Sequence, residues 1–215
     1  LSMRFILILT LFSQALFGQY FGQNKVQYNE FDWNFIVSPN FNVYYYGDNY
    51  DLAIFTSTIA EESLDQIGKH LRWRSQQPIK IIVYTSHNDF QQTNIVNVYM
   101  SEGIGGVTEL YKNRIVIPFE GSYAQFKHVI HHELVHAIIN DMVYGGNVQG
   151  VLSGRILLQV PLWANEGLAE FLSVDWDTNT DMVLRDLAIE ENLPEIDQLN
   201  YSILAYKGGQ SIWKY

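Results

Sequence analysis

Residues 122–142 read SYAQFKHVIHHELVHAIINDM, and this segment carries more structural information than any other in the chain. Apolar side chains recur in it every four residues: Phe126, Ile130, Leu134 and Ile138. That spacing is typical of one face of an α-helix. Ser122 followed by Gln125 is a capping-box pattern, which satisfies two backbone donors where a helix begins. The segment is therefore predicted to be an α-helix with one buried face.

The same segment contains the motif His-Glu-x-x-His at residues 132–136. His132 and His136 are four residues apart, so on a helix both imidazoles project from one face. Their ring nitrogens can then bind one metal ion at about 2 Å. Glu133 is rotated roughly 100° from His132 around the helix, so it is poorly placed as a third ligand. It can instead lie beside the open coordination position and act as a general base towards water.

The other histidines leave alternatives open. His128 and His132 are also four residues apart and could form the metal-binding pair. The glutamate favours His132 and His136, because only that pair places a carboxylate beside the open position. His131 is expected to support the site from behind or to face solvent. A set of structural histidines without a metal is the ordinary alternative, and we assign that role to the isolated His70 and His87.

A hydrolytic zinc site needs a third protein ligand and a water molecule. Residues 161–172 read PLWANEGLAEFL and continue a helical pattern to residue 174. Glu166 and Glu170 lie on the same side of this helix, and Glu166 is the predicted third ligand. Glu170 is predicted to orient a zinc-bound histidine by a hydrogen bond. Gly167 has no Cβ and is predicted to let this helix approach the histidine helix closely; two acids on a solvated face are the alternative reading.

The remaining pattern predicts an α+β chain. Runs rich in β-branched and aromatic residues predict strands at 41–46, 80–85, 107–110 and 114–118, the last two joined by a turn at Lys112-Asn113. Helical periodicity marks residues 51–73, 122–142, 162–174, 182–190 and 203–215. This order predicts a small N-terminal sheet lobe that includes the histidine helix, followed by a helical lobe. Residues 19–215 are predicted to form one domain.

Composition narrows the class of protein. The chain has 215 residues, of which 47% are hydrophobic and 17% charged, so it contains enough apolar material for a core. Its net charge of −10 and its scarcity of Lys and Arg argue against nucleic acid as a partner. The absence of cysteine excludes disulfides, thiolate metal sites and cysteine nucleophiles. Any metal must therefore be bound by imidazole, carboxylate or backbone oxygen.

The N-terminus is predicted to be a secretory signal peptide over residues 1–18. Arg4 precedes an apolar run over residues 5–17, and Gly18 provides a small residue for cleavage. The run is shorter than the roughly 20 residues that a transmembrane helix needs. We therefore expect an exported protein, periplasmic, surface-attached or secreted, with no membrane span in the mature chain; an N-terminal anchor or buried helix is the alternative. Because an apolar helical pattern runs to Tyr215, we also expect the natural protein to continue beyond it.

The motif pair resembles that of the gluzincin metallopeptidases, which include thermolysin-like and aminopeptidase-N-like enzymes. The resemblance is carried by HExxH at residues 132–136 and by NEGLAE at residues 165–170. It implies a zincin-like fold and hydrolysis of a peptide or protein substrate. It also implies that His132, His136 and Glu166 bind Zn²⁺, that Glu133 is the catalytic base, and that Glu170 supports a ligand.

A narrower resemblance is to exported bacterial peptidase-MA-like domains, which are often followed by a TolB-like β-propeller. It is carried by the PxWxxEGLAE pattern at residues 161–170 and by AYKGGQS at residues 205–211. It implies a possible C-terminal propeller in the full-length protein. The chain departs from aminopeptidases in one respect, since GGVTE at residues 105–109 is only a poor match to their exopeptidase motif.

Two further assignments concern substrate handling. A phenol commonly stabilises the oxyanion in the enzymes that this chain resembles, so Tyr206 and Tyr201 are candidates for that role. With 14 tyrosines in the chain, both could equally be packing residues. The strand at residues 115–118 is expected to line the cleft and pair with an extended peptide. The sequence thus favours a zinc peptidase; a non-catalytic zincin-fold scaffold attached to a propeller and a zinc hydrolase with non-peptide substrates are the alternatives.

Overall fold

The structure is a computed structural model. It describes residues 28–75, 77–96, 100, 103–110, 112–144, 160–199 and 202–215. The predicted signal peptide at residues 1–18 and the candidate Tyr201 lie outside these ranges. Within them, no helix combines the length and the apolarity that crossing a bilayer requires.

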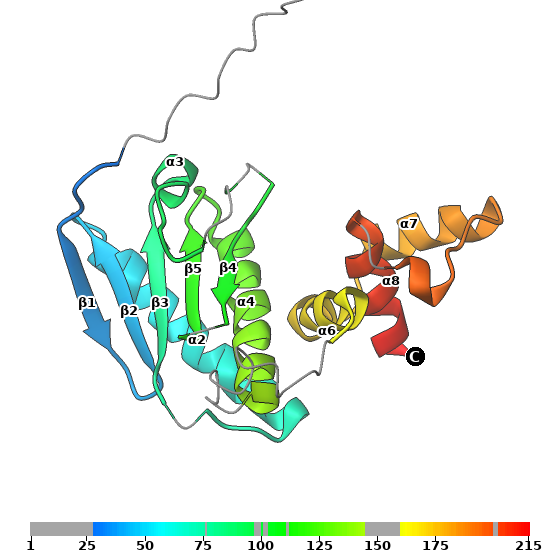
Figure 1. Cartoon of the computed structure of the whole chain (residues 1–215), viewed down its shortest axis with the longest axis horizontal. Helices are drawn as coiled ribbons and strands as arrows, with labels where there is room; N and C mark the ends of the chain where they lie inside the picture. Colours follow the sequence, from blue (N-terminus) through cyan, green and yellow to red (C-terminus); the bar gives the residue numbers. More distant parts are fainter. Residues whose placement is uncertain are drawn as a thin grey trace, which may run out of the picture.

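A five-stranded mixed sheet forms the first part of the molecule, with strand order β1-β2-β3-β5-β4 (Figure 1). Strands β2, β3 and β5 are mutually parallel, whereas β1 and β4 pair antiparallel at the two edges. The bounds are β1 Trp33–Val37, β2 Phe41–Tyr46, β3 Ile79–Tyr84, β4 Val107–Glu109 and β5 Arg114–Pro118. The predicted α+β class is confirmed, and β1 is an additional strand that the sequence pattern did not predict.

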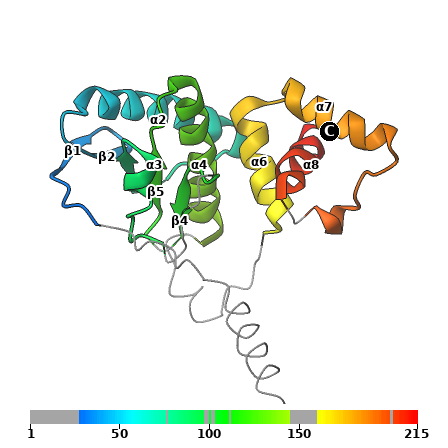
Figure 2. The same ribbon diagram turned by 90° about the horizontal axis from the view of Figure 1, so that it is seen from above.

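Helices α2 (Tyr50–Leu71) and α4 (Tyr123–Tyr144) cover one face of this sheet (Figure 2). The apolar face predicted for residues 122–142 is the face that packs inwards, since its Ile130, Leu134 and Ile138 have no exposed surface. They join strand residues such as Val43, Ile81 and Ile117 in the main hydrophobic core. Burial of this face positions α4, and so fixes which of its side chains point away from the core.

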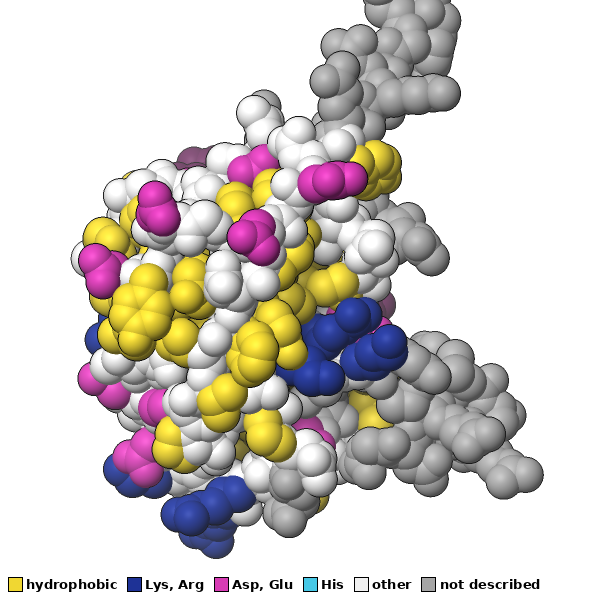
Figure 3. Space-filling view, turned by 90° about the vertical axis from the view of Figure 1, so that its left-hand side faces the viewer, with side chains coloured by type: hydrophobic (Ala, Val, Ile, Leu, Met, Phe, Trp, Pro, Cys, Tyr) yellow, Lys and Arg dark blue, Asp and Glu magenta, His cyan; other side chains and the backbone are white. Residues whose placement is uncertain are grey.

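The opposite face of the sheet is only partly covered. A second cluster of Tyr84, Phe90, Met100 and Val116 covers its centre, with Phe90 supplied by the short helix α3 (His87–Phe90). Towards β1, Phe35 and Val37 are 59% and 69% exposed. Figure 3 shows hydrophobic side chains gathered on this side of the molecule. The exposed pattern of β1 explains why its sequence lacks the alternation that marks a half-buried strand.

The helical lobe comprises α6 (Leu162–Val174), α7 (Thr178–Ile189), the 3₁₀ turn η1 (Ile196–Gln198) and α8 (Ser202–Lys214). Helix α7 begins four residues before its predicted start at residue 182. Asp177 caps it by accepting a hydrogen bond from the Thr180 backbone N–H at 2.8 Å, upstream of the first apolar residue of the pattern. In Figure 1, α6 lies between α4 and α8.

Gly167 faces α8 and not α4, so the predicted role of this glycine is wrong. A Cβ on Gly167 would lie 2.2 Å from the backbone carbon of Gly209, and a Cβ on Gly209 would lie 2.0 Å from the Trp163 carbonyl oxygen. The reason is geometric. Consecutive residues are about 100° apart around a helix, so Gly167 must point elsewhere when Glu166 points towards α4.

Candidate metal centre

Helix α4 starts at the predicted position. The Gln125 backbone N–H donates to Ser122 Oγ at 3.4 Å, which is one of the two bonds of the predicted capping box. Because the apolar face of α4 is held against the sheet, His132 and His136 emerge together on the side that faces α6. Helix α6 presents Glu166 to them.

Three ligand atoms converge at this point from the two helices. His132 Nε2 and His136 Nε2 are 3.1 Å apart, and Glu166 Oε2 lies 3.2 Å from each of them. A tetrahedral zinc ion with bonds of about 2.0–2.1 Å would separate its ligands by about 3.3–3.4 Å. The three side chains are only 11–14% exposed. Their geometry and their donor set of two imidazoles and one carboxylate therefore fit a zinc ion.

The charges at this point are strongly coupled. Burial would raise the pKa of Glu166, but hydrogen bonds with His132 and His136 outweigh it and lower the pKa to about 2. Burial would lower the pKa of His132, yet its hydrogen bonds with Glu166 and Glu170 raise the pKa to about 10. Without a metal, a proton on His132 thus supplies the positive charge that a bound cation would otherwise provide.

Glu170 lies behind His132, on the other ring nitrogen. Its Oε1 is 3.2 Å from His132 Nδ1 and 3.6 Å from His128 Nε2, and its Oε2 is 3.9 Å from Lys207 Nζ. Burial would raise the pKa of Glu170, but hydrogen bonds and charge interactions with His128 and His132 hold it well below its usual range. A carboxylate in this position fixes the tautomer of the imidazole so that Nε2 carries a lone pair for a metal.

A second group of possible ligands, His128, His132 and Glu170, shares His132 with the first. A neutral imidazole has one lone pair, so His132 can serve only one of the two groups. The distances between the ligand atoms of the first group are all 3.1–3.2 Å. In the second group, the distance between His128 Nε2 and Glu170 Oε1 is 3.6 Å. We take the first group as the candidate metal site, because Glu170 then supports His132 through Nδ1 while Nε2 faces Glu166.

Glu133 belongs to neither group, and its carboxylate is held by strand β4. Thr108 Oγ1 lies 2.7 Å from Glu133 Oε2 and 3.0 Å from the Glu133 carbonyl oxygen. Sequence reasoning missed Thr108, because a single threonine in a short strand carries no recognisable signal. It did single out residues 105–109, as a poor match to an exopeptidase motif. The Glu109 side chain in that stretch is instead paired with Arg114, Nε to Oε2 at 2.8 Å.

An open cleft passes over these residues between β4 and the helical lobe. Two cavities of about 370 and 320 Å³ meet there. Both are lined by Gly106, His132, Glu133 and Tyr206. The predicted pairing of residues 115–118 with a peptide is wrong for Ile115 and Val116, because β5 lies between β3 and β4 and these two residues are paired on both edges. Strand β4 is the edge strand that borders the cleft.

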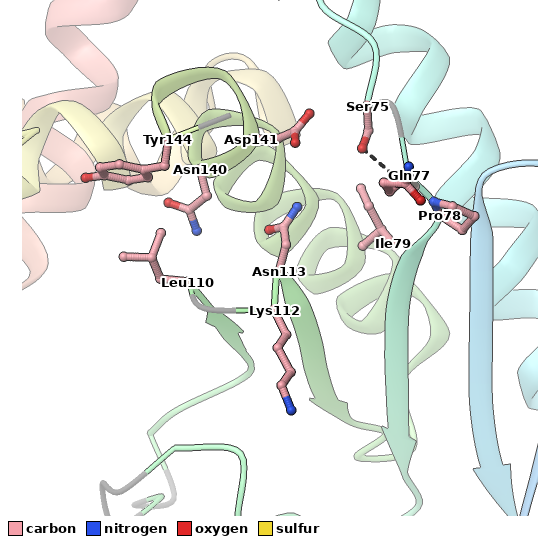
Figure 4. Close-up of a pocket in the computed structure, with 10 residues that line it drawn as sticks. All are labelled: Ser75, Gln77, Pro78, Ile79, Leu110, Lys112, Asn113, Asn140, Asp141 and Tyr144. Carbon is pink, nitrogen blue, oxygen red and sulfur yellow. Dashed lines mark hydrogen bonds between the residues drawn. The ribbon is translucent and has the colours of Figure 1, made fainter. Parts of the chain in front are cut away.

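The cleft continues past the metal centre into a third cavity of about 200 Å³. Leu110 and Asn140 line both this cavity and the cavity of about 320 Å³ at the metal centre. Figure 4 shows the side chains of Asn113 and Asn140 projecting into the space, while the Lys112 ammonium group extends away from it. This end of the cleft is lined by amides and apolar groups together with the Asp141 carboxylate.

Tyr206 reaches the site from α8. Its ring lies parallel to that of His132, with centroids 6.0 Å apart at 18°. Burial, the negative charge of Glu166 and a hydrogen bond to Glu166 raise the pKa of the Tyr206 phenol well above its usual range. The phenol therefore keeps its proton at neutral pH and can act as a hydrogen-bond donor in the cleft.

The remaining histidines lie outside the first ligand group. His131 is 6% exposed, so it does not face solvent. Burial and the nearby positive charges of His128 and His132 lower the pKa of His131 to about 4. His87 hydrogen-bonds Glu120 through Nδ1 at 3.0 Å, in agreement with a structural role.

Comparison with known proteins gives one result. Residues 59–207, more than half of the chain, match a sequence family described as the Peptidase MA superfamily. The matched range contains α4, α6 and the first six residues of α8. Neither the curated proteins nor the solved structures give a significant match.

Proposed function

We propose that this chain, which belongs to the Peptidase MA superfamily, is a zinc-dependent peptidase of the gluzincin type. His132, His136 and Glu166 would hold the zinc ion, and Glu133 would be the general base. One observation carries the proposal. Three ligand atoms from α4 and α6, on side chains that are 11–14% exposed, lie within 3.1–3.2 Å of one another, and the Glu133 carboxylate lines the same open cleft.

A zinc ion in this place would polarise the scissile carbonyl group and lower the pKa of a water molecule at its open coordination position. The residues of the chain supply the remaining steps. Glu133 takes a proton from the attacking water and passes it to the leaving amine. Glu170 keeps the His132 ring in the required tautomer. The Tyr206 phenol, whose one proton is directed to Glu166 in the structure, would turn this proton to the oxyanion that develops on the substrate.

Peptides are the substrate class that the surroundings of the site favour. Strand β4 is an edge strand beside the cleft, and an extended peptide can pair with such an edge through its backbone. The cleft also extends on both sides of Glu133, through Gly103–Gly106 in one direction and through Leu110 and Asn140 in the other. A substrate with residues on both sides of the scissile bond fits this shape.

We also propose that the protein is exported and that a β-propeller can follow this domain. The first proposal rests on the sequence pattern at residues 1–18, and the second on the resemblance carried by residues 161–170 and 205–211. Expression of the full-length gene with mass spectrometry of the mature N-terminus tests the first. A mature protein that still contains the apolar run at residues 5–17 would contradict export by a cleaved signal peptide.

The central proposal is tested by measuring zinc content and proteolysis on the same samples. Wild type and Glu133→Gln are each assayed for bound zinc and for cleavage of casein and of a fluorogenic peptide library. We expect about one zinc per chain in both, and a loss of activity of about 10²- to 10⁴-fold in the variant. If both proteins bind zinc and neither cleaves, the non-catalytic scaffold is the better description.

A further inference from the structure

We propose that Thr108 is a positioning residue that holds the Glu133 carboxylate in the orientation needed for proton transfer, while Gly106 keeps space beside it. This inference rests on the proposed function, because it assigns how the general base of that reaction is held. Thr108 and Gly106 are two residues apart on an extended stretch, so they project to the same side, towards α4.

The contact between Thr108 and the carboxylate is short. Thr108 Oγ1 lies 2.7 Å from Glu133 Oε2, which is the usual distance for a hydroxyl group bonded to a carboxylate. Among the described residues, no other side chain hydrogen-bonds the Glu133 carboxylate. Glu133 itself is 7% exposed, so a shift of its side chain is not readily compensated by bulk water.

Thr108 has one hydroxyl proton and two acceptors within reach. The second acceptor is the carbonyl oxygen of Glu133 at 3.0 Å, to which α4 also directs a helical hydrogen bond. The hydroxyl can therefore donate to Oε2, the nearer of the two acceptors. Thr108 thus holds the Glu133 side chain from the β4 side.

The absence of a side chain at Gly106 leaves space on the other side of the Glu133 carboxylate. A Cβ at this position would lie 2.9 Å from Glu133 Cγ, 3.0 Å from Glu133 Oε1 and 2.9 Å from Ile117 Cγ2. Since Ile117 is fully buried in β5, the carboxylate would have to move instead. The missing side chain therefore leaves Oε1 accessible from the cleft, while Thr108 engages Oε2.

The decisive comparison is Thr108→Val against Thr108→Ser, each assayed with zinc bound. Valine keeps the shape and removes the hydrogen bond, whereas serine keeps the hydroxyl. We expect Thr108→Val to lower kcat by about 10- to 100-fold with little change in KM, and Thr108→Ser to restore most of it. Zinc content should equal that of wild type in both, because Thr108 contacts none of the ligand atoms.

A matched control separates positioning from stability. Thr56 is fully buried in α2 and donates to the Leu52 carbonyl oxygen at 2.7 Å, far along the sequence from the cleft. Thr56→Val therefore also removes a threonine-to-carbonyl hydrogen bond. We expect it to lower the melting temperature without changing kcat. If Thr108→Val lowered only the melting temperature and kept kcat, Thr108 would be a structural residue and the inference would be wrong.

Crystal structures provide a readout that does not depend on activity. We expect the Glu133 carboxylate to rotate away from β4 in Thr108→Val and to keep its position in Thr108→Ser. An unchanged Glu133 in the valine variant would overturn the inference. This measurement remains decisive even if the zinc-loaded wild type fails to cleave peptides, in which case the proposed function alone is refuted.

Discussion

Helices α4 and α6 contribute to the metal centre in different ways. Helix α4 supplies two imidazoles and a carboxylate within five consecutive residues, so their relative positions follow from helix geometry alone. Helix α6 supplies a single candidate ligand, Glu166, whose position depends on packing against both α4 and α8. One half of the site is thus determined locally and the other by tertiary structure. Substitutions that disturb the packing between helices should therefore displace Glu166 more readily than they displace His132 and His136.

The strongest test of this contrast removes the ligand that α6 provides. We expect Glu166→Ala to lower zinc affinity by about 10- to 100-fold or more, because an open position replaces a charged ligand. Competition with a chromophoric chelator measures the affinity. Glu62→Ala is the control, since its side chain is 56% exposed and forms a 4.0 Å ion pair with Lys127. Wild-type affinity in Glu166→Ala would exclude α6 from the metal site.

A smaller effect is expected from the residue that supports a ligand without binding the metal. Glu170→Gln keeps the shape of the side chain but removes its charge from His132 Nδ1. We expect zinc affinity to fall by about 10-fold, which is less than for Glu166→Ala. The same chelator competition applies. A loss as large as that of Glu166→Ala would instead indicate that the ion lies between His128, His132 and Glu170.

The smallest expected effect is on proton release. In the metal-free protein the pKa of His132 is raised to about 10, so this ring is protonated at pH 8 and must lose a proton when zinc binds. Zinc affinity should therefore rise with pH in this range, by up to about 10-fold per pH unit. Titration calorimetry in two buffers of different ionisation enthalpy counts the protons. The Glu170→Gln variant should release fewer protons on zinc binding, because the substitution removes one cause of the raised pKa of His132. Equal proton release in the variant and wild type would show that Glu170 does not raise this pKa.

The same contrast explains what the sequence alone could predict. The α+β class and the bounds of α6 followed from periodicity, because helix and strand spacing are local properties. The grouping of His132 and His136 followed from their separation along one helix. Two assignments were wrong, the partner of Gly167 and the strand at the cleft. Both depend on which element packs beside which, and the periodicity within a single element does not specify this.

The structural features that the sequence did not predict are those that produce no periodic pattern of residues. Strand β1 escaped prediction because Trp33–Val37 is exposed along most of its length and shows no alternation. Thr108 escaped because its role depends on the register of β4 against β5, where it pairs with Ile115. A residue whose contact lies 25 positions away in the chain leaves no periodic trace in the sequence around it.

The contact between Gly167 and Gly209 has a mechanical consequence. With backbone against backbone, and with Trp213 Nε1 bonded to the Ala164 carbonyl at 2.9 Å, α6 and α8 cannot slide past one another without a collision. Glu166 and Tyr206 are carried by these two helices. Any hinge motion between the sheet and the helical part would therefore move the Glu166 and Tyr206 side chains together across the cleft, with the distance between them unchanged.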